Sequence, residues 1–459
     1  MRTEPREQQK LNREHSSQPG HRTRMAEKKG YTLNSWARIS LLAKDSQVVF
    51  NNLFSHINEE NLRQAFRAID GSKAVGIDNI TKKQYAQNLE ENLQDLKGRL
   101  HLGTYRPQAK REVLIPKSNG STRPIAIGCF EDKIVEWITG KILESVYEPI
   151  FINNSFGFRP RRSADDAIKA NYNILKDNKR PFVVEIDLKN FFNTVPHDKL
   201  MEILSYRISD RKLNGLIRRF VKADIIKQDG ELLASTVGTP QGSVMSPILA
   251  NIYLHHVLDK WFAAKYASKD AVQVRYADDA IFMFSKKESA KSFLNELENR
   301  LMKYGLALNS DKTGIIDFRE GNENVFHFLG FTFHWNHRKG WNRCKLVIKT
   351  QKEKLFKKIS EYTEWIKANR AKHSTEEIWK ITASKLRGHY NYFGYYCNRS
   401  KLMHFYCGVR RALFTWINRR SQKRSFTWKQ FGAKLLRNPL PIPPEQTQLK
   451  NLGWNPYVK

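Results

Sequence analysis

Two adjacent aspartates divide a strongly apolar segment, Val272–Phe284, and constrain the fold more than any other feature of the chain. The segment reads VQVRYADDAIFMF, so β-branched and aromatic residues flank Asp278 and Asp279 on both sides. This pattern predicts two strands joined by a tight hairpin with both carboxylates at its tip. Charges beside a buried sheet are costly unless a cation compensates them. The alternative is a solvated turn, in which Asp is a common residue.

A near-duplicate of this motif provides an internal control. Ser163–Ile168 reads SADDAI, but it follows an arginine cluster and leads into a helical pattern. There Asp165 and Asp166 suit the first turn of a helix that Ser163 caps, where the helix dipole favours carboxylates. The Asp-Asp pair therefore indicates a functional site only when strands surround it.

A second apolar strand is predicted at Pro181–Leu188, and an acid, Asp187, lies at its end. If this strand joins the sheet of the hairpin, Asp187, Asp278 and Asp279 lie together and can hold two Mg²⁺ ions. Two such ions roughly 3.5–4 Å apart activate an attacking 3′-oxygen and stabilise leaving pyrophosphate. Carboxylates together with water are ligands that Mg²⁺ prefers. The pattern therefore predicts a centre for phosphoryl transfer.

The chain is strongly basic, and its charge is uneven. Its 459 residues include 79 Lys and Arg against 46 Asp and Glu, a formal net charge of +33. The stretch Phe331–Lys459 alone has 28 basic and 6 acidic residues. This asymmetry predicts a catalytic body followed by a module that binds nucleic acid. The four cysteines form no C-x-x-C pair and no apolar run approaches the ~18 residues of a membrane span, which argues against zinc ribbons and membrane proteins.

Apolar periodicity gives a coarse division of the chain. Residues 1–35 predict a disordered basic arm. Ser40–Leu100 has helical spacing, whereas Val113–Ile127 predicts two short strands joined by a Gly/Ser turn. Past Lys349 the spacing is helical again, with lysines on the polar faces. The last ~20 residues are rich in proline and predict extended or loop structure.

Ordered blocks then place the chain in a family. From about Leu62 to the C-terminal prolines it resembles the group II intron-encoded reverse transcriptase/maturase proteins of bacterial type. The blocks that carry the resemblance follow the family's order: GIDNIT at Gly76–Thr81, IPKSNGSTRPIAI at Ile115–Ile127, SFGFRPRRSADDAI at Ser155–Ile168, EIDLKNFFNTV at Glu185–Val195, GTPQGSVMSPILANIYL at Gly238–Leu254, RYADDAIF at Arg275–Phe282, LNSDKT at Leu308–Thr313 and FHFLGF at Phe326–Phe331.

The resemblance implies an α+β fold, a right-hand polymerase with fingers (36–180), a palm that carries the catalytic sheet (181–335) and a helical thumb/maturase (X) domain (336–425). A short basic C-terminal segment (426–459) would bind DNA or RNA. The implied activity is RNA-directed DNA polymerisation with two Mg²⁺ ions, for which Mn²⁺ can substitute. The expected partners are an RNA template, with structured group II intron RNA favoured, a DNA primer and deoxynucleoside triphosphates. A maturase would also assist splicing and mobility of its intron. We expect a cytoplasmic bacterial protein that associates with the nucleoid or a ribonucleoprotein.

The same resemblance assigns roles near the predicted sheet. Asp187, Asp278 and Asp279 match the catalytic metal ligands. Phe192 matches the bulky residue that clashes with a ribose 2′-hydroxyl and so selects deoxynucleotides. The alternative for Phe192 is an ordinary buried aromatic on a strand-to-helix turn.

Five further positions match residues that bind the incoming nucleotide. Lys117 and Arg123 would neutralise the triphosphate. Gln241 would line the nucleotide pocket, and Gly242 would let the backbone approach the substrate closely. Lys312 matches a lysine that protonates the leaving pyrophosphate.

The remaining candidates lie toward the C-terminus. Leu329 and Gly330 match the turn that grips the primer, although the aromatics around them also suit core packing. In the thumb, most aromatics of Leu386–Asn398 are expected in the core. The basic residues expected to face nucleic-acid phosphates are Arg387, Arg410, Arg411, Arg419, Arg420, Lys423 and Arg424.

One departure from the family pattern and two alternatives remain. Many members add a C-terminal DNA endonuclease with Cys and His metal ligands, and no such ligand set follows Asn418, so we expect no second-strand cleavage. One alternative is a non-catalytic RNA-binding splicing factor, which the complete set of aspartates together with Phe192 and Gln241 argues against. The other is a domesticated or defence-associated reverse transcriptase outside any intron.

Overall fold

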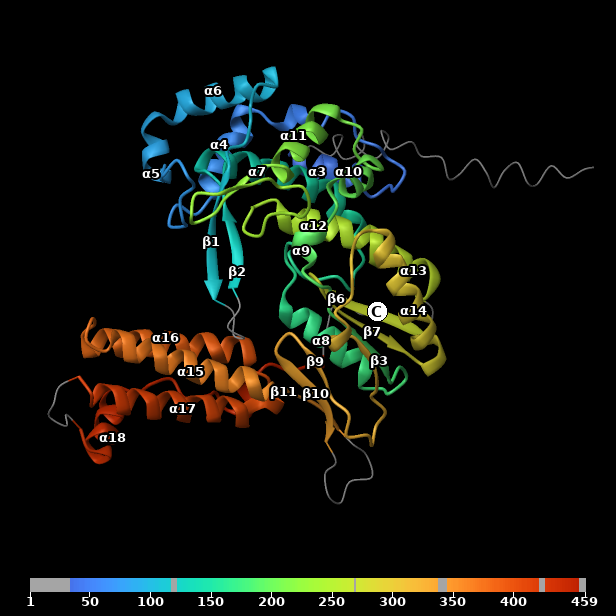
Figure 1. The fold of residues 1–459 in the computed structure, drawn as a ribbon. Coiled ribbons are helices and arrows are strands. Elements are labelled where there is room, and N and C mark those ends of the chain that lie inside the picture. Colours follow the sequence, from blue (N-terminus) through green and yellow to red (C-terminus); the bar gives the residue numbers. More distant parts are fainter. Residues whose placement is uncertain (1–33, 117–121, 268–269, 337–344, 421–425, 454–459) are drawn as a thin grey trace, which may run out of the picture.

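The computed structural model describes residues 34–116, 122–267, 270–336, 345–420 and 426–453 (Figure 1). Of the candidate positions, Lys117, Lys423 and Arg424 lie outside these ranges. The predicted N-terminal arm also lies outside them, except for Asn34 and Ser35.

Helices surround one long buried helix in the N-terminal part of the chain. α7 (Phe130–Tyr147) buries residues on nearly all its faces, including Ile134, Val135 and Ile138. A helix that is apolar all round belongs in a core. The helices of this part are α3 (Ser35–Leu42), α4 (Glu59–Ala68), α5 (Lys82–Tyr85), α6 (Leu89–Leu102), α10 (His197–Ser205), α11 (Arg211–Val221) and α12 (Ser246–Leu254).

A strand hairpin extends from this helical part toward the C-terminal helices (Figure 1). β1 (Lys110–Pro116) and β2 (Thr122–Ile127) pair antiparallel, with Arg111 opposite Ile127. The short strands β4 (Ile225–Ile226) and β5 (Leu232–Leu233) complete a sheet of order β2-β1-β4-β5. The hairpin predicted for Val113–Ile127 is thus confirmed.

The central sheet has the order β6-β7-β3-β8, and all neighbours are antiparallel. Alternate residues enter two different cores, since Val184 and Phe282 pack in one and Val183 and Ile281 in the other. Burial on both faces explains why these strands are almost continuously apolar. The strands are β3 (Phe182–Ile186), β6 (Ala271–Tyr276), β7 (Asp279–Phe284) and β8 (Gly314–Asp317).

Helices cover both faces of the central sheet. α14 (Lys287–Lys303) and α13 (Lys260–Lys265) pack on one face, where Phe293 and Phe262 contact Phe282. α8 (Ala164–Leu175) belongs to the core on the other face. Ser163 caps α8 and forms a capping box with Asp166, which confirms the helical interpretation of the near-duplicate motif.

A second small sheet joins the palm to a bundle of C-terminal helices. β9 (Phe326–Phe328), β10 (Phe331–Asn336) and β11 (Lys345–Thr350) have the order β11-β10-β9, so this sheet crosses the boundary proposed at residue 336. α15 (Lys352–Asn369) starts two residues after β11. α16 (Thr375–Phe393), α17 (Arg399–Ile417) and α18 (Trp428–Arg437) complete the bundle. None of the described helices is long and apolar enough to cross a bilayer.

Candidate active site

Strand register brings Asp187 and the Asp278–Asp279 hairpin to the same end of the central sheet. β3 and β7 pair with Ile186 opposite Ala280, so Asp187 and Asp279 follow as the next pair along the two strands. β6 and β7 pair up to Tyr276 and Asp279, which leaves Ala277 and Asp278 as a two-residue turn. Ala277 has a left-handed φ of 56°, as tight hairpin turns require. The predicted hairpin is confirmed, with Asp278 in its turn and Asp279 opening β7.

A buried ion pair holds this hairpin from behind. The Arg275 guanidinium donates two hydrogen bonds to Asp259, at 2.9 and 2.6 Å, and a third of 2.9 Å to the Ala277 carbonyl in the turn. Both side chains are almost fully buried, at 1% and 0% exposure. Burial opposes ionisation of Asp259, but the charge of Arg275 holds the pKa of Asp259 well below its usual range. The backbone of the turn is therefore fixed by a charge-assisted network.

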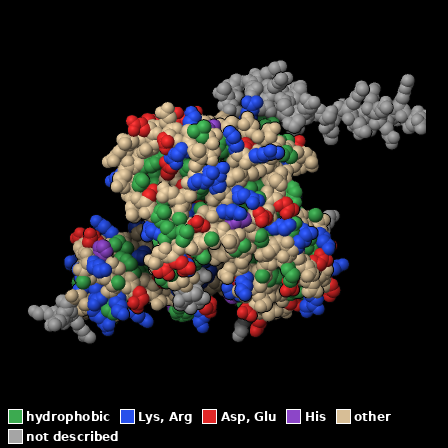
Figure 2. Space-filling view, turned by 45° about the horizontal axis from the view of Figure 1, so that its top comes forward, with side chains coloured by type: hydrophobic (Ala, Val, Ile, Leu, Met, Phe, Trp, Pro, Cys, Tyr) green, Lys and Arg blue, Asp and Glu red, His purple; other side chains and the backbone are tan. Residues whose placement is uncertain are grey.

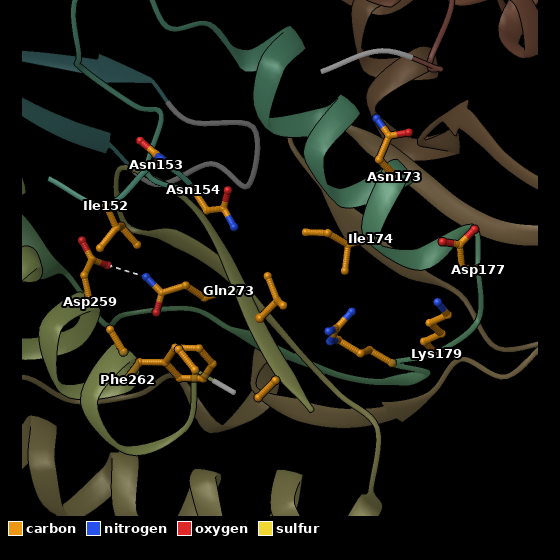
Figure 3. Close-up of a pocket in the computed structure, with 15 residues that line it drawn as sticks. Ile152, Asn153, Asn154, Asn173, Ile174, Asp177, Lys179, Asp259, Phe262 and Gln273 are labelled. Atoms are coloured by element: carbon orange, nitrogen blue, oxygen red, sulfur yellow. Dashed lines mark hydrogen bonds between the residues drawn. The ribbon is translucent and has the colours of Figure 1, made fainter. Parts of the chain in front are cut away.

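The network borders a hollow behind the sheet (Figure 3). Gln273 donates a 2.8 Å hydrogen bond to Asp259 there. The hollow measures about 600 Å³ and lies between α8, α13 and β6. Its described lining includes none of Asp187, Asp278 and Asp279, so it is separate from the carboxylate end of the sheet.

Glycine at position 157 lets another segment contact the hairpin. A Cβ on Gly157 would lie 2.3 Å from the Ala277 nitrogen, which no side chain could tolerate. The Gly157 carbonyl accepts a 2.8 Å hydrogen bond from Asn251, whose own side-chain oxygen accepts from Arg275 at 3.0 Å. The turn is thus enclosed by backbone on one side and by the Arg275 network on the other.

Burial and mutual repulsion raise the pKa values of three carboxyls of this site, Asp278, Asp279 and Glu185. Burial, followed by the charges of Asp278 and Asp187, raises the pKa of Asp279 to about 6. Burial and the charge of Asp187 also raise the pKa of Asp278. Burial, with smaller effects of Asp279 and Asp187, raises the pKa of Glu185 to about 7. Hard oxygen donors that repel one another suit a divalent cation such as Mg²⁺.

Asp187 is held by residues from the segment before β8. Its Oδ2 accepts hydrogen bonds from Asn309 at 2.9 Å and from the Lys312 ammonium at 3.3 Å. As placed, no group of three or more His, Cys, Asp or Glu side chains among the described residues forms a metal-binding cluster. The three aspartates thus share one end of the sheet, while Asp187 is directed to Lys312.

The loop Gly238–Val244 contacts Phe192 on one side and β2 on the other. The Thr239 amide donates to the Phe192 carbonyl at 2.6 Å, and the Gln241 carbonyl accepts from Ala126 at 2.6 Å. Phe192 lies on α9 (Phe191–Thr194) and is half-buried rather than sealed in the core. Its side chain therefore remains partly accessible next to this loop.

The structure adds a physical reason for glycine at position 242. Its φ is +102°, and a Cβ there would lie 2.6 Å from Ile125 Cγ2 and 2.9 Å from the Ala126 carbonyl oxygen. The close approach that glycine permits is to strand β2 of the fingers. The approach of this backbone to the substrate stays a prediction, beside the observed contact with β2.

Arg123 is exposed on β2, opposite Ile115. Its positive charge lowers the pKa of Asp278, against the larger effect of burial. Arg123 is thus within electrostatic range of the aspartates, although Lys117 is not described.

The turn Leu329–Gly330 lies beside Asp279. Both residues have positive φ, 47° and 88°, and connect β9 to β10. The Leu329 carbonyl accepts a 2.9 Å hydrogen bond from Tyr392, and the Gly330 carbonyl accepts from Gln351 at 3.0 Å. The flanking phenylalanines are buried, so they are core residues and only the turn itself reaches the site.

A groove of about 550 Å³ leads from this turn between α15 and α16. Three lysines, Lys354, Lys358 and Lys385, lie along it. A Cβ on Gly330 would be 3.6 Å from Lys354 Nζ, so this ammonium borders the turn. Lys and Arg side chains are also dense on the helical lobe at the lower left of Figure 2.

The structure places the predicted thumb residues in different settings. Arg387 and Arg411 are exposed, and Arg410 is half-buried. Arg419 is exposed and lies over the Trp416 ring at 5.0 Å. Arg420 instead donates to Thr375 Oγ1 at 3.0 Å and to the His373 carbonyl at 2.9 Å. The Arg420 guanidinium thus joins the segment after α17 to the start of α16, and its role toward phosphate stays a prediction.

Sequence reasoning missed several residues that shape the site. Asn309 stands in the LNSDKT block beside Lys312, and its position there was a usable signal. Asp259 and Lys354 carried no local signal, since one lies on an apolar helix and the other among many lysines.

Comparisons with known proteins show which family the chain resembles. Residues 115–333 match the family described as "Reverse transcriptase (RNA-dependent DNA polymerase)". Protein YkfC of Escherichia coli (strain K12) is 31% identical over 392 residues, covering 77% of this chain and 96% of that protein. Group II intron-encoded protein LtrA of Lactococcus lactis subsp. cremoris is 34% identical over 236 residues, covering 49% of this chain but only 38% of LtrA.

A solved structure of apo telomerase from Candida tropicalis, truncated from its C-terminal domain, is also similar. It covers 59% of this chain and 61% of that chain at 17% identity, with a TM-score of 0.41. We draw no conclusion from a likeness this low. From the family match and the relatives, the chain belongs to the group II intron-encoded reverse transcriptase/maturase family of RNA-directed DNA polymerases.

Proposed function

We propose that Asp187, Asp278 and Asp279 are the catalytic carboxylates and hold two Mg²⁺ ions, for which Mn²⁺ can substitute. The observation that carries the proposal is the strand register. It brings Asp187 next to Asp279 at the end of the sheet where the turn contains Asp278. The raised pKa values of Asp278 and Asp279 support it, because repelling carboxylates favour a cation. When bound, such ions would polarise the primer 3′-hydroxyl and neutralise the triphosphate.

The residues around the carboxylates suit an incoming deoxynucleotide. Arg123, together with Lys117, would bind the triphosphate, and Phe192 would exclude a ribose 2′-hydroxyl. Gln241 and Gly242 would form the pocket wall between Phe192 and β2. Lys312 would donate a proton to pyrophosphate, and its ammonium 3.3 Å from Asp187 supports this role.

The groove between α15 and α16 suits the primer–template duplex. It begins at Asp279 and the Leu329–Gly330 turn, and Lys354, Lys358 and Lys385 lie along it. An RNA–DNA duplex presents phosphates at regular intervals, and lysines bind them without reading sequence. We place the primer 3′ end at the turn and the duplex over these lysines.

The maturase role would use other basic residues of the thumb. Arg387, Arg410, Arg411 and Arg419 would bind structured RNA, along with Lys423 and Arg424. These positions combine with the name of LtrA, an intron-encoded protein, to favour intron RNA as the partner. Comparing splicing of the intron RNA with parent and Asp278→Asn protein separates this role from polymerisation.

Primer extension with the Asp278→Asn variant tests the active site. Because the change removes a charge without altering shape, incorporation of deoxynucleotides should fall by about 10³-fold or more, while RNA binding stays within about twofold of the parent. Asp166→Asn, in the near-duplicate motif at the start of α8, is the matched control and should extend primers normally. Parental activity in Asp278→Asn would refute the assignment.

A further inference from the structure

Glu136 is a fully buried carboxylate to which two distant parts of the polymerase donate hydrogen bonds. It lies on α7 with 1% exposure, although a lone buried acid is costly. Its Oε1 accepts from the Lys110 ammonium at 2.7 Å and from the Ser243 hydroxyl at 2.8 Å. Its Oε2 accepts from the Val244 amide at 2.8 Å. Both carboxylate oxygens are therefore engaged.

These partners belong to the two elements on which the proposed nucleotide-binding residues Arg123 and Gln241 lie. Lys110 opens strand β1 of the fingers hairpin, whose partner strand β2 carries Arg123. Ser243 and Val244 end the loop that begins at Gly238. Glu136 is thus the point at which a single side chain joins the fingers hairpin to the nucleotide-pocket loop.

The Gly238–Val244 loop also contacts Phe192, the candidate sugar gate that would exclude a ribose 2′-hydroxyl. The Thr239 amide binds the Phe192 carbonyl at 2.6 Å, and the Gln241 carbonyl binds the Ala126 amide of β2 at 2.6 Å. Phe192, β2 and Glu136 therefore help to hold the loop, in addition to Val195 and His197, which bond Gly238, and Ser246, which bonds the Pro240 carbonyl. Of these, only Glu136 acts through a side-chain charge, so it can be altered without changing the backbone.

We propose that Glu136 is a positioning residue for nucleotide selection. By binding Lys110 and the Ser243–Val244 segment at once, it keeps the triphosphate-binding hairpin and the sugar-gate loop in one fixed relation. Glu136 itself does not reach substrate, because it is sealed beneath the loop. The inference rests on the proposed roles of Arg123 and Phe192 in nucleotide binding.

Steady-state primer extension with varied deoxynucleotide concentration tests the inference. Two variants weaken the junction: Ser243→Ala removes one hydrogen bond to the carboxylate, and Glu136→Gln removes the charge. The loss of a hydrogen bond to a charged group corresponds to about a tenfold effect. We expect the KM for deoxynucleotide to rise on the order of tenfold, kcat to change less than about twofold, and duplex affinity to stay unchanged.

Discrimination provides a readout that a purely structural role would not move. The ratio of kcat/KM for deoxy- over ribonucleotide should fall several-fold, because the loop also sets Phe192. Glu131→Gln is the matched control on the same helix: Glu131 binds Arg99 at 2.9 Å, away from the Gly238–Val244 loop, so its KM and discrimination should be parental.

The outcomes separate the role of Glu136 from the proposed role of Phe192. A folded Ser243→Ala variant with parental KM and parental discrimination overturns the inference, even if Glu136→Gln fails to fold. Loss of discrimination in Phe192→Ala, measured in parallel, reports on the sugar gate alone. If Phe192→Ala discriminates like the parent, the proposed gate is wrong, whereas the KM result still decides the role of Glu136.

Discussion

Removing the charge of Asp259 should destabilise the palm and disturb the catalytic turn. In the Asp259→Asn variant, Arg275 remains buried at 1% exposure without its countercharge. Breaking a buried ion pair by removing one partner costs about 3–5 kcal/mol of stability. An asparagine oxygen can still accept one hydrogen bond from Arg275 or Gln273, so we expect a value near the lower end, about 3 kcal/mol. Natural domains have only about 5–15 kcal/mol in total.

Urea unfolding followed by fluorescence measures this loss, provided that the slope of the transition is unchanged. Asp317→Asn is the control on strand β8 of the same sheet. Its partner Arg319 is largely exposed, at 59%, and exposed pairs contribute about 0–1 kcal/mol. Primer extension by Asp259→Asn should also weaken, because Arg275 binds the carbonyl of Ala277 in the turn.

A loss below about 1 kcal/mol in Asp259→Asn would refute the reasoning, since it would mean that Arg275 finds another way to be solvated. A double-mutant cycle with Arg275→Met adds a second criterion. The two residues are in direct contact, so the double variant should lose less stability than the sum of the single variants. Strict additivity would contradict the network described for the turn.

Three further predictions follow from the structure. Gly242→Ala should raise the KM for deoxynucleotide, because its φ of +102° and its contact with β2 leave no room for a methyl group; Gly98→Ala, with nothing within 4 Å, is the control in helix α6 and should not. Lys354→Gln should weaken duplex binding and reduce its salt slope by roughly one, measured by fluorescence anisotropy at several salt concentrations. Burial raises the pKa of Asp132 from 3.8 to about 6, so between these values the native state binds more protons than the unfolded state. The unfolding free energy should therefore fall by up to about 3 kcal/mol as pH rises through this window. Asp132→Asn should flatten that part of the curve of stability against pH, and an unchanged curve would contradict the assignment.

Local patterns predicted the strands and the hairpin turn well. The alternation in β3 and β7 was almost lost, because both faces of the sheet are buried, but the run of β-branched residues still identified strands. The two copies of the ADD motif were separated by their flanks alone. In the sequence, the helix that Ser163 caps and the hairpin at Asp278 differ only in what precedes and follows them.

Contacts between distant residues could not be predicted in the same way. Glu136 and Ser243 are 107 residues apart, and the sequence of neither segment indicates a contact with the other. The glycine at 242 signalled an unusual backbone but not that β2 is its neighbour. Arg420 illustrates a second limit, because charge does not reveal whether a guanidinium is engaged inside the protein.

The short connection from β11 to α15 has a mechanical consequence. Only Gln351 separates the strand from the helix, and its amide is bonded to Gly330. A tilt of the helical bundle would therefore pull directly on the turn beside Asp279. We expect the helical bundle and the Leu329–Gly330 turn to move together as the product strand grows.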